Sequence, residues 1–114
     1  MRIHRYCMRG SGQSGNDCLV DWELQGRTGA ESGGDGKWVT LRSHVGDRAL
    51  FNVSRSAEPF QWVTWVVEGC LFEVDAVRIA MTGVNTNRNA SLVMVGLEVY
   101  GCLSDPNMLC RDGF

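Results

Sequence analysis

Residues 18–26 read CLVDWELQG, and apolar and polar side chains alternate along this stretch. Val20, Trp22 and Leu24 occupy every second position, and the positions next to them hold acidic or amide side chains. A period of two places successive side chains on opposite faces of an extended chain. The stretch is therefore predicted to be a β-strand with one buried face.

Immediately before this strand, Gly10, Gly12 and Gly15 have the spacing GxGxxG, which also occurs in dinucleotide-binding turns. Such a turn needs a helix directly after it, because the pyrophosphate lies at the helix N-terminus. The predicted strand takes the place of that helix. An acidic residue at a suitable distance, Asp35, lies in GGDGKW, which is typical of a turn. The glycines are interpreted as a loop between two strands, and no cofactor is expected.

The same pattern of short β-rich runs, separated by Gly, Asn, Asp or Ser clusters, continues along the chain. The predicted strands are residues 2–8, 19–25, 37–43, 60–67, 76–82 and 92–101. With 114 residues the chain suits one domain. These features predict an all-β fold, an antiparallel β-sandwich or jelly roll, with Trp22, Trp38 and Ile79 in its core.

Composition and charge exclude several classes of partner. The formal net charge of −2 offers no electrostatic footprint for nucleic acid. No apolar run is long enough for a transmembrane segment, and the opening MRIHRYCMRG lacks the apolar core of a signal peptide. A cytoplasmic location is expected, with a secreted or cell-surface location as the alternative. Asn52 and Asn89 lie in glycosylation sequons, which matter only on the secretory pathway.

Catalytic and metal-binding patterns are weak. The five cysteines, an odd number with irregular spacing, fit neither a disulfide framework nor a paired zinc site, so most are expected to be reduced and metal-free. His44 is interpreted as a polar residue at the start of a loop, and nothing near His4 in the sequence marks it as a base. No motif groups the carboxylates. The chain is not expected to be an enzyme.

Four segments together resemble the discoidin family, the coagulation-factor type C domains of the galactose-binding-like superfamily. They are DWELQG (21–26), DGKWVTL (35–41), VRIAMTGVN (77–85) and SLVMVGLEVYG (91–101). The opening HRYCMRG (4–10) is similar to a strand of intracellular members attached to ubiquitin ligases and to BTB or kelch proteins. The resemblance implies a jelly-roll sandwich that binds a partner without catalysis.

The resemblance covers residues 3–102, with 1–102 forming the domain and 103–114 a C-terminal extension. The N-terminal part of the family domain has no counterpart here, so the sandwich is expected to be incomplete. Exposed strand edges would then favour self-association or pairing with a partner strand, unless 103–114 folds back over them. Cys102 matches a cysteine whose disulfide partner, in secreted relatives, lies in the missing part.

Candidate ligand-binding residues follow from the parity of the strands, because successive connections in an antiparallel sandwich lie at alternating ends. Loops 9–18, 44–59 and 83–91 are predicted to share one end. The candidate residues in these loops are Arg9, Gln13, Asn16, Asp47, Arg48, Asn85, Asn87 and Arg88, with Asn52, Arg55 and Asn89 beside them. They offer hydrogen bonds without apolar wedges, which suits a sugar, a peptide backbone or an acidic partner. The alternative is that they are ordinary solvated turn residues.

Two functions remain open from the sequence. The first is a protein-interaction module within a larger intracellular protein or assembly. The second is a secreted or cell-surface domain that binds carbohydrate or lipid.

Overall fold

The computed structural model describes residues 1–10, 18–29, 34–56, 61–67, 73–86, 88 and 96–102. Its elements are β1 (Arg2–Arg9), β2 (Trp22–Thr28), β3 (Lys37–His44), α1 (Ala49–Ser54), β4 (Val63–Val66), β5 (Ala76–Met81) and β6 (Gly96–Cys102). All six predicted strands are present, so the all-β prediction is confirmed. β1, β3 and β5 begin and end within one residue of their predicted bounds, whereas β2 lies three residues further along the chain.

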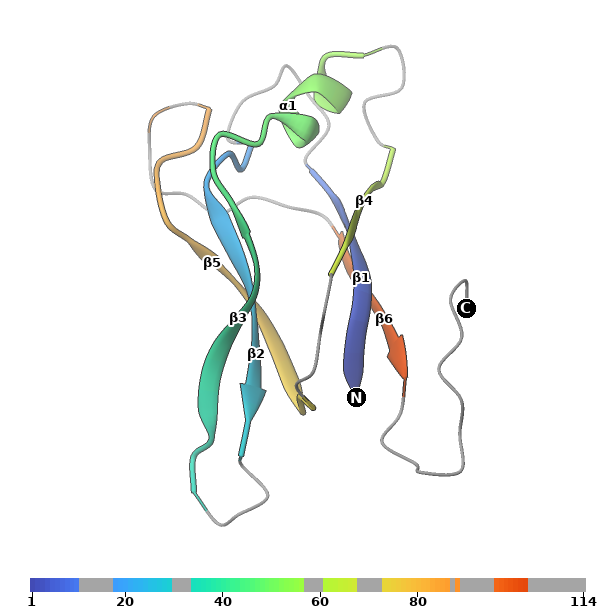
Figure 1. Ribbon diagram of the computed structural model, residues 1–114. Helices are drawn as coiled ribbons and strands as arrows, with labels where there is room; N and C mark the ends of the chain where they lie inside the picture. The colour runs from blue at the N-terminus through green and yellow to red at the C-terminus, as the bar shows by residue number, and fades with distance from the viewer. Residues whose placement is uncertain are drawn as a thin grey trace.

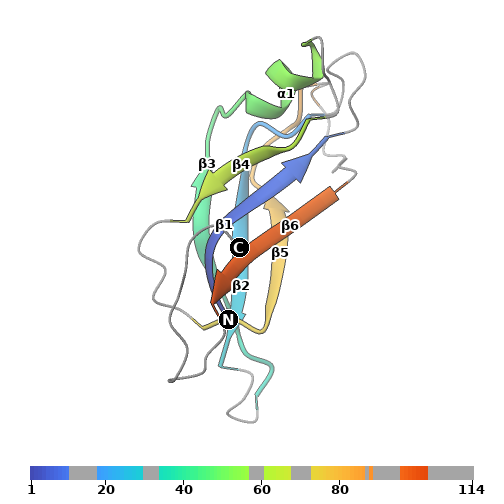
Figure 2. The ribbon, with the colours of Figure 1, turned by 90° about the vertical axis from the view of Figure 1, so that its right-hand side faces the viewer.

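The strands form two antiparallel sheets of three strands, in the orders β4-β1-β6 and β3-β2-β5. Figure 1 shows the two sheets facing each other, and Figure 2 shows the β4-β1-β6 sheet from its outer side. The first and last strands of the described residues, β1 and β6, pair directly. The β4-β1-β6 sheet is therefore held together by strand pairing between residues far apart in the sequence.

The alternation that predicted β2 also sets its two faces. Trp22 and Leu24 are fully buried, at 0% exposure. Glu23 and Gln25, the residues that alternate with them, lie on the outer face. There Gln25 Nε2 donates a hydrogen bond to Glu23 Oε1 (2.9 Å). Because β2 begins soon after Gly10, it occupies the place of the helix that a dinucleotide-binding turn requires. Gly12 and Gly15 lie outside the described residues.

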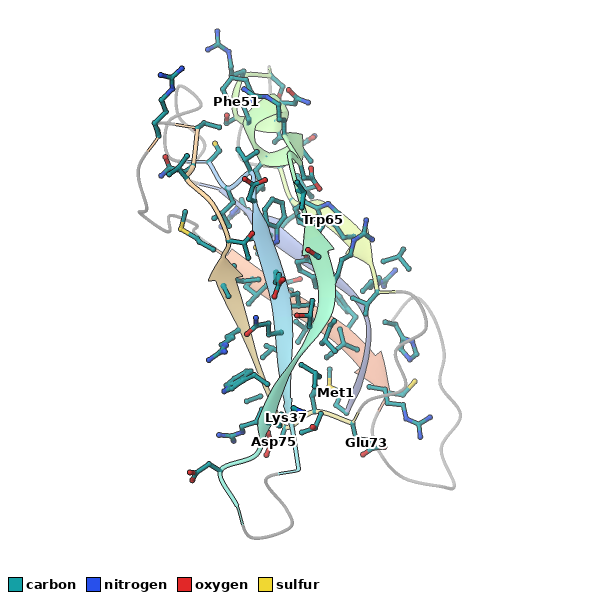
Figure 3. All side chains as sticks on the ribbon, turned by 60° about the vertical axis from the view of Figure 1, so that its left-hand side comes forward. Met1, Lys37, Phe51, Trp65, Glu73 and Asp75 are labelled. Atoms are coloured by element: carbon teal, nitrogen blue, oxygen red, sulfur yellow. The ribbon has the colours of Figure 1, made fainter. Side chains whose placement is uncertain are left out.

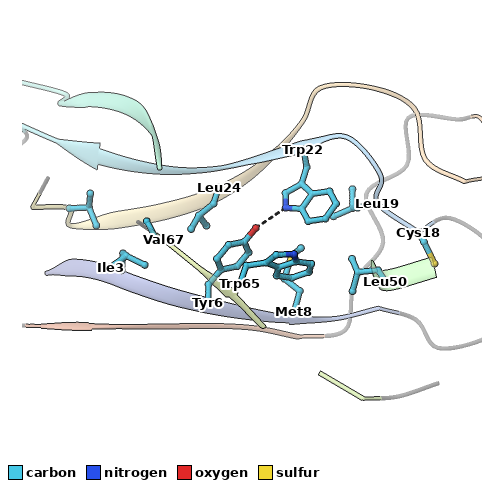
Figure 4. Close-up of a cluster of buried hydrophobic side chains, with 11 residues drawn as sticks. Ile3, Tyr6, Met8, Cys18, Leu19, Trp22, Leu24, Leu50, Trp65 and Val67 are labelled. Carbon is cyan, nitrogen blue, oxygen red and sulfur yellow. Dashed lines mark hydrogen bonds between the residues drawn. The ribbon is translucent and has the colours of Figure 1, made fainter. Parts of the chain in front are cut away.

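Both sheets and α1 contribute to one hydrophobic core, part of which is shown in Figure 4. Its buried residues are Ile3, Tyr6, Met8, Cys18, Leu19, Trp22, Leu24, Leu50, Trp65, Val67 and Val74. Rings from opposite sheets meet there: Trp22 of β2 lies edge-on to Trp65 of β4, with ring centroids 5.3 Å apart. Burial of this apolar surface is the main force that holds the sheets together.

The three residues predicted for the core differ in their positions. Trp22 is in the core as predicted, and Ile79 is partly buried and packed against it. The prediction for Trp38 is wrong, because this residue lies opposite Arg27 on the outer face of β3. There the guanidinium of Arg78 lies over the indole ring, with Cζ 4.1 Å from the centroid. The register of β3 shifts at Leu41, and this shift separates Trp38 from the inward face.

Gly101 of β6 has no room for a side chain. It pairs with Ile3 where the register between β1 and β6 shifts, and a Cβ at Gly101 would lie only 1.9 Å from the carbonyl oxygen of Arg2. Gly101→Ala is expected to lower the free energy of unfolding by about 1–3 kcal/mol, because backbone must move. Gly10→Ala is the matched control, since its Cβ would meet nothing within 4 Å. Thermal melts of both variants measure the difference, and equal melting temperatures would contradict this prediction.

Candidate functional site

Three connections and α1 gather at one end of the sandwich, which we call the α1 end (Figure 1). Backbone hydrogen bonds run from Asp47 N to Val20 O (3.0 Å), from Thr82 N to Asp21 O (3.1 Å) and from Thr86 N to Cys18 O (3.0 Å). They tie the residues before β2 to the connection after β3 and to the connection after β5. This arrangement agrees with the parity argument for the described residues.

The predicted binding residues that the structure describes all lie at the α1 end. They are Arg9, Asp47, Arg48, Asn85 and Arg88, whereas Gln13, Asn16 and Asn87 lie outside the described residues. Arg48 and Arg88 are exposed, but Asn85 is only 3% exposed. Asn85 therefore belongs to the packed interior of this end and is not placed to contact a ligand.

The carboxylate of Asp47 is directed into the protein. Its Oδ1 accepts the backbone N–H of Ala49 at the start of α1 (3.0 Å), and its Oδ2 accepts the indole N–H of Trp65 (3.1 Å). Oδ2 also lies 2.8 Å from His44 Nδ1. Asp47 thus anchors α1 to the core, and both of its carboxylate oxygens are engaged in internal hydrogen bonds.

Arg9 is set apart from the other arginines of this end. Its guanidinium lies over the ring of Trp62, with Cζ 5.0 Å from the centroid, and its buried Nε has no hydrogen-bond partner among the described residues. Trp62 itself packs on Gly96, where a Cβ would lie 2.4 Å from the indole. Arg9 therefore covers the end of the β4-β1-β6 sheet.

Arg48 and Arg55 flank Phe51, a residue that the sequence reasoning did not single out. The Cζ atoms of Arg48 and Arg55 lie 4.5 Å and 5.6 Å from the Phe51 ring centroid. Positions 48, 51 and 55 have the spacing i, i+3, i+7 that places residues on one face of a helix. That spacing is the signal in the sequence that could have identified this group.

Apolar side chains are also exposed at this end, which corrects the expectation of a surface without apolar wedges. Val45 is 84% exposed and Val84 is 53% exposed. The glycines next to them, Gly46 and Gly83, lie against the Asp21 carboxylate: Gly46 N donates to Oδ1 (2.7 Å), and a Cβ at Gly83 would overlap Oδ2. The residues next to both valines therefore lie against the same carboxylate, that of Asp21.

His44 is the centre of a buried hydrogen-bonded chain, and it is not the loop-start residue that the sequence suggested. At 3% exposure it pairs with Trp22 in the sheet and stacks on its indole, with centroids 4.1 Å apart. The Tyr6 hydroxyl contacts Nε2 of His44 and accepts the indole N–H of Trp22 (3.1 Å). No motif in the sequence identifies this chain, because its members come together only through strand pairing.

The neighbours of His44 assign its tautomer. Nδ1–H donates to the Asp47 carboxylate and Nε2 accepts from the Tyr6 hydroxyl, so every member of the chain is satisfied when the imidazole is neutral. Burial lowers the pKa of His44 below its usual value, although the Asp47 carboxylate opposes this shift. Burial also raises the pKa of the Tyr6 hydroxyl.

The pKa of Asp47 is held below its usual value by opposing effects. Burial raises it, but hydrogen bonds from the Ala49 amide, from His44 and from Trp65 together lower it further. The carboxylate therefore stays ionised beside a neutral imidazole. Such a chain resembles an acid–base relay in composition, but its reactive atoms face the core, so in this geometry it holds β1, β3, β4 and α1 together.

Potential metal ligands do not cluster in the described ranges: no group of three or more His, Cys, Asp or Glu side chains is brought together there. Cys7 and Cys18 carry buried thiols, as expected for small apolar residues. Cys102 is disulfide-bonded, a state that the sequence left open for this residue. Its sulfur lies 3.2 Å from His4 Nε2.

Comparisons of the chain with protein families, characterised proteins and solved structures find no match. The likeness to the discoidin family therefore rests on the four sequence segments. The described part of the chain holds no helix with the length and apolarity needed to cross a membrane.

Proposed function

We propose that this chain is a non-catalytic binding module that contacts an acidic protein partner through the α1 end, within a larger intracellular protein or assembly. One observation carries the proposal: the exposed charged side chains described at this end, Arg48, Arg55 and Arg88, are all cations. The two carboxylates described nearby, Asp21 and Asp47, accept internal hydrogen bonds and are less exposed than these arginines. Among the described residues of this end, four arginines (Arg9, Arg48, Arg55 and Arg88) therefore outnumber two carboxylates, which leaves this part of the surface net positive.

The opposite end differs in its electrostatics. There Arg27 Nε pairs with Asp75 (2.9 Å) and Arg2 Nε lies 3.6 Å from Glu73 Oε1, so cations and anions compensate one another. Figure 3 shows Asp75 and Glu73 at this end, far from Phe51 on α1. A net charge of −2 for the whole chain thus coexists with a locally basic surface. Complementary charge of this kind speeds association and selects partners.

Charge reversal at the α1 end tests the proposal. Arg88→Glu is expected to weaken the binding of a fluorescein-labelled glutamate-rich peptide about three- to tenfold, because a favourable exposed pair becomes a repulsive one. Lys37→Glu makes the same charge change at the opposite end and should leave affinity unchanged. Fluorescence anisotropy at two salt concentrations measures both variants. Equal loss in the two variants, or no saturable binding by the wild-type chain, would argue against this site.

A second candidate is a secreted or cell-surface domain that binds carbohydrate or lipid. The disulfide of Cys102 favours it, since disulfides persist in oxidising compartments. The exposed Val45 and Val84 also suit contact with an apolar surface. Co-sedimentation with phosphatidylcholine vesicles distinguishes the candidates: binding that Val45→Ser and Val84→Ser abolish would support the second and displace the first.

A further inference from the structure

Arg48 and Arg55 form a cluster with Phe51 that is more ordered than a basic loop. Arg48 directly precedes α1 and Arg55 directly follows it, and both guanidiniums contact the ring between them. A guanidinium over an aromatic face is held there by the ring quadrupole, while its N–H groups remain available at its edge. Two forks of hydrogen-bond donors are thus presented from one short segment.

The segment that carries the Arg48–Phe51–Arg55 cluster is fixed on the core. Leu50, one residue before Phe51, is buried at 3% exposure. Asp47 accepts the backbone N–H of Ala49 at the start of α1, and Ser54 Oγ donates to the Phe51 carbonyl at its end (2.7 Å). Side chains on such a fixed element lose less entropy when they bind a ligand.

The cluster lacks a counter-charge within the described part of the chain. No carboxylate there forms an ion pair with Arg48 or Arg55, and both side chains are exposed. Two like charges that share one ring repel each other, so an anion that contacts both guanidiniums relieves this repulsion. The charge and the donors of the cluster therefore select the kind of anion that binds.

A phosphate monoester matches the cluster better than a carboxylate does. It carries a charge of about −1.5 to −2 at pH 7 and has three strong acceptor oxygens, so it can accept from two guanidiniums at once. A glutamate carboxylate carries one charge and is satisfied by one bidentate arginine. We infer that the Arg48–Phe51–Arg55 cluster is a subsite for a phosphorylated serine or threonine in the acidic segment of the partner, an inference that rests on the proposed function.

The test uses one glutamate-rich peptide with a central serine, synthesised with and without phosphate on that serine. The wild-type chain is expected to bind the phosphorylated peptide at least tenfold more tightly in fluorescence anisotropy. In the Arg48→Gln, Arg55→Gln double variant this preference should disappear, while affinity for the unphosphorylated peptide falls much less. Arg48→Lys with Arg55→Lys keeps the charge but loses the bidentate fork, and should retain only part of the preference.

Two controls separate the cluster from general charge and from folding. Arg88→Gln removes an exposed cation outside the cluster and should leave the preference for phosphate intact. Phe51→Leu keeps an apolar side chain but removes the ring, and should reduce the preference while thermal melting stays cooperative. If Arg88→Gln loses the preference for the phosphorylated peptide while the variants of Arg48 and Arg55 keep it, the phosphate does not bind at the Arg48–Phe51–Arg55 cluster.

The outcomes distinguish the two proposals. If both peptides bind the wild-type chain with equal affinity, the subsite is wrong and the acidic-partner function stands. If neither peptide binds, both proposals fail. If a sulfated heparin oligosaccharide or phosphatidylserine vesicles bind in an Arg48- and Arg55-dependent way and the peptides do not, the cluster serves a different ligand and the phosphopeptide inference is overturned.

Discussion

Trp22→Ala is expected to lower the free energy of unfolding by about 3–5 kcal/mol, because it empties the largest fully buried position in the core. The substitution also removes the stacking partner of His44 and the indole N–H that Tyr6 accepts. A loss of this size consumes much of the stability that a domain of this length has. Urea denaturation monitored by circular dichroism measures the change in midpoint.

Trp38→Ala is the matched control for this prediction. Trp38 is partly exposed on the outer face of β3, where the guanidinium of Arg78 lies over its ring. Loss of an exposed cation–π pair costs about 0.5–1 kcal/mol. The two variants remove the same side chain, so the difference between their midpoints reports the burial of Trp22 together with its contacts to His44 and Tyr6. A Trp38→Ala protein as destabilised as Trp22→Ala would mean that the assignment of the inner and outer faces is wrong.

The second large effect is expected at His44. His44→Gln should lower the free energy of unfolding at pH 8 by about 1–3 kcal/mol, because Tyr6 and Asp47 lose a buried hydrogen-bonding partner. Stacking on Trp22 is lost as well. Urea denaturation at pH 8 measures this loss, and an unchanged midpoint would contradict the role given to the Tyr6–His44–Asp47 chain.

The wild-type protein is also expected to lose stability as the pH falls. The folded-state pKa of His44 lies below the unfolded value of 6.5, so the unfolded chain binds the extra proton more readily. The stabilising contribution is present above pH 6.5 and is lost as the pH falls through and below that value. Protonation would place hydrogen on both His44 Nε2 and the Tyr6 hydroxyl, so the hydroxyl would need a new acceptor.

Asp47 adds a second acid-sensitive step at lower pH. Its folded-state pKa lies below the ordinary value of 3.8, so its contribution is present above pH 3.8 and is lost below it. Denaturation midpoints measured from pH 8 to pH 5 therefore isolate His44. The loss over this range should be reduced in His44→Gln and should persist in His4→Gln. A pH dependence that survives in His44→Gln would assign the effect to another group.

The alternation of residues 20–25 was sufficient to predict a half-buried strand, because the side-chain period of an extended chain is fixed by its backbone. The same rule predicted the other five strands from short runs between turn residues. It also sorted the loops, since each antiparallel strand returns the chain to the opposite end. The arginines at positions 48, 55 and 88 could therefore be assigned to one surface from the sequence.

The side-chain chemistry within that surface was not predictable in the same way. Arg48, Asp47 and Asn85 are all polar loop residues in the sequence, yet only Arg48 is exposed. Asp47 is directed inward because Trp65, His44 and the first N–H group of α1 all require its oxygens. These partners lie on β4, β3 and α1, and only packing brings them together.

What the sequence determined by itself was the set of strands, and what the tertiary structure decided was which residues of β3 face the core. Trp38 and His44 have the same parity, so a regular strand would place both on one face. The register shift at Leu41 reverses the alternation between them, which leaves Trp38 outside and turns His44 toward Trp22. A bulge of this kind depends on how β3 pairs with β2, and a single-strand pattern does not contain that information.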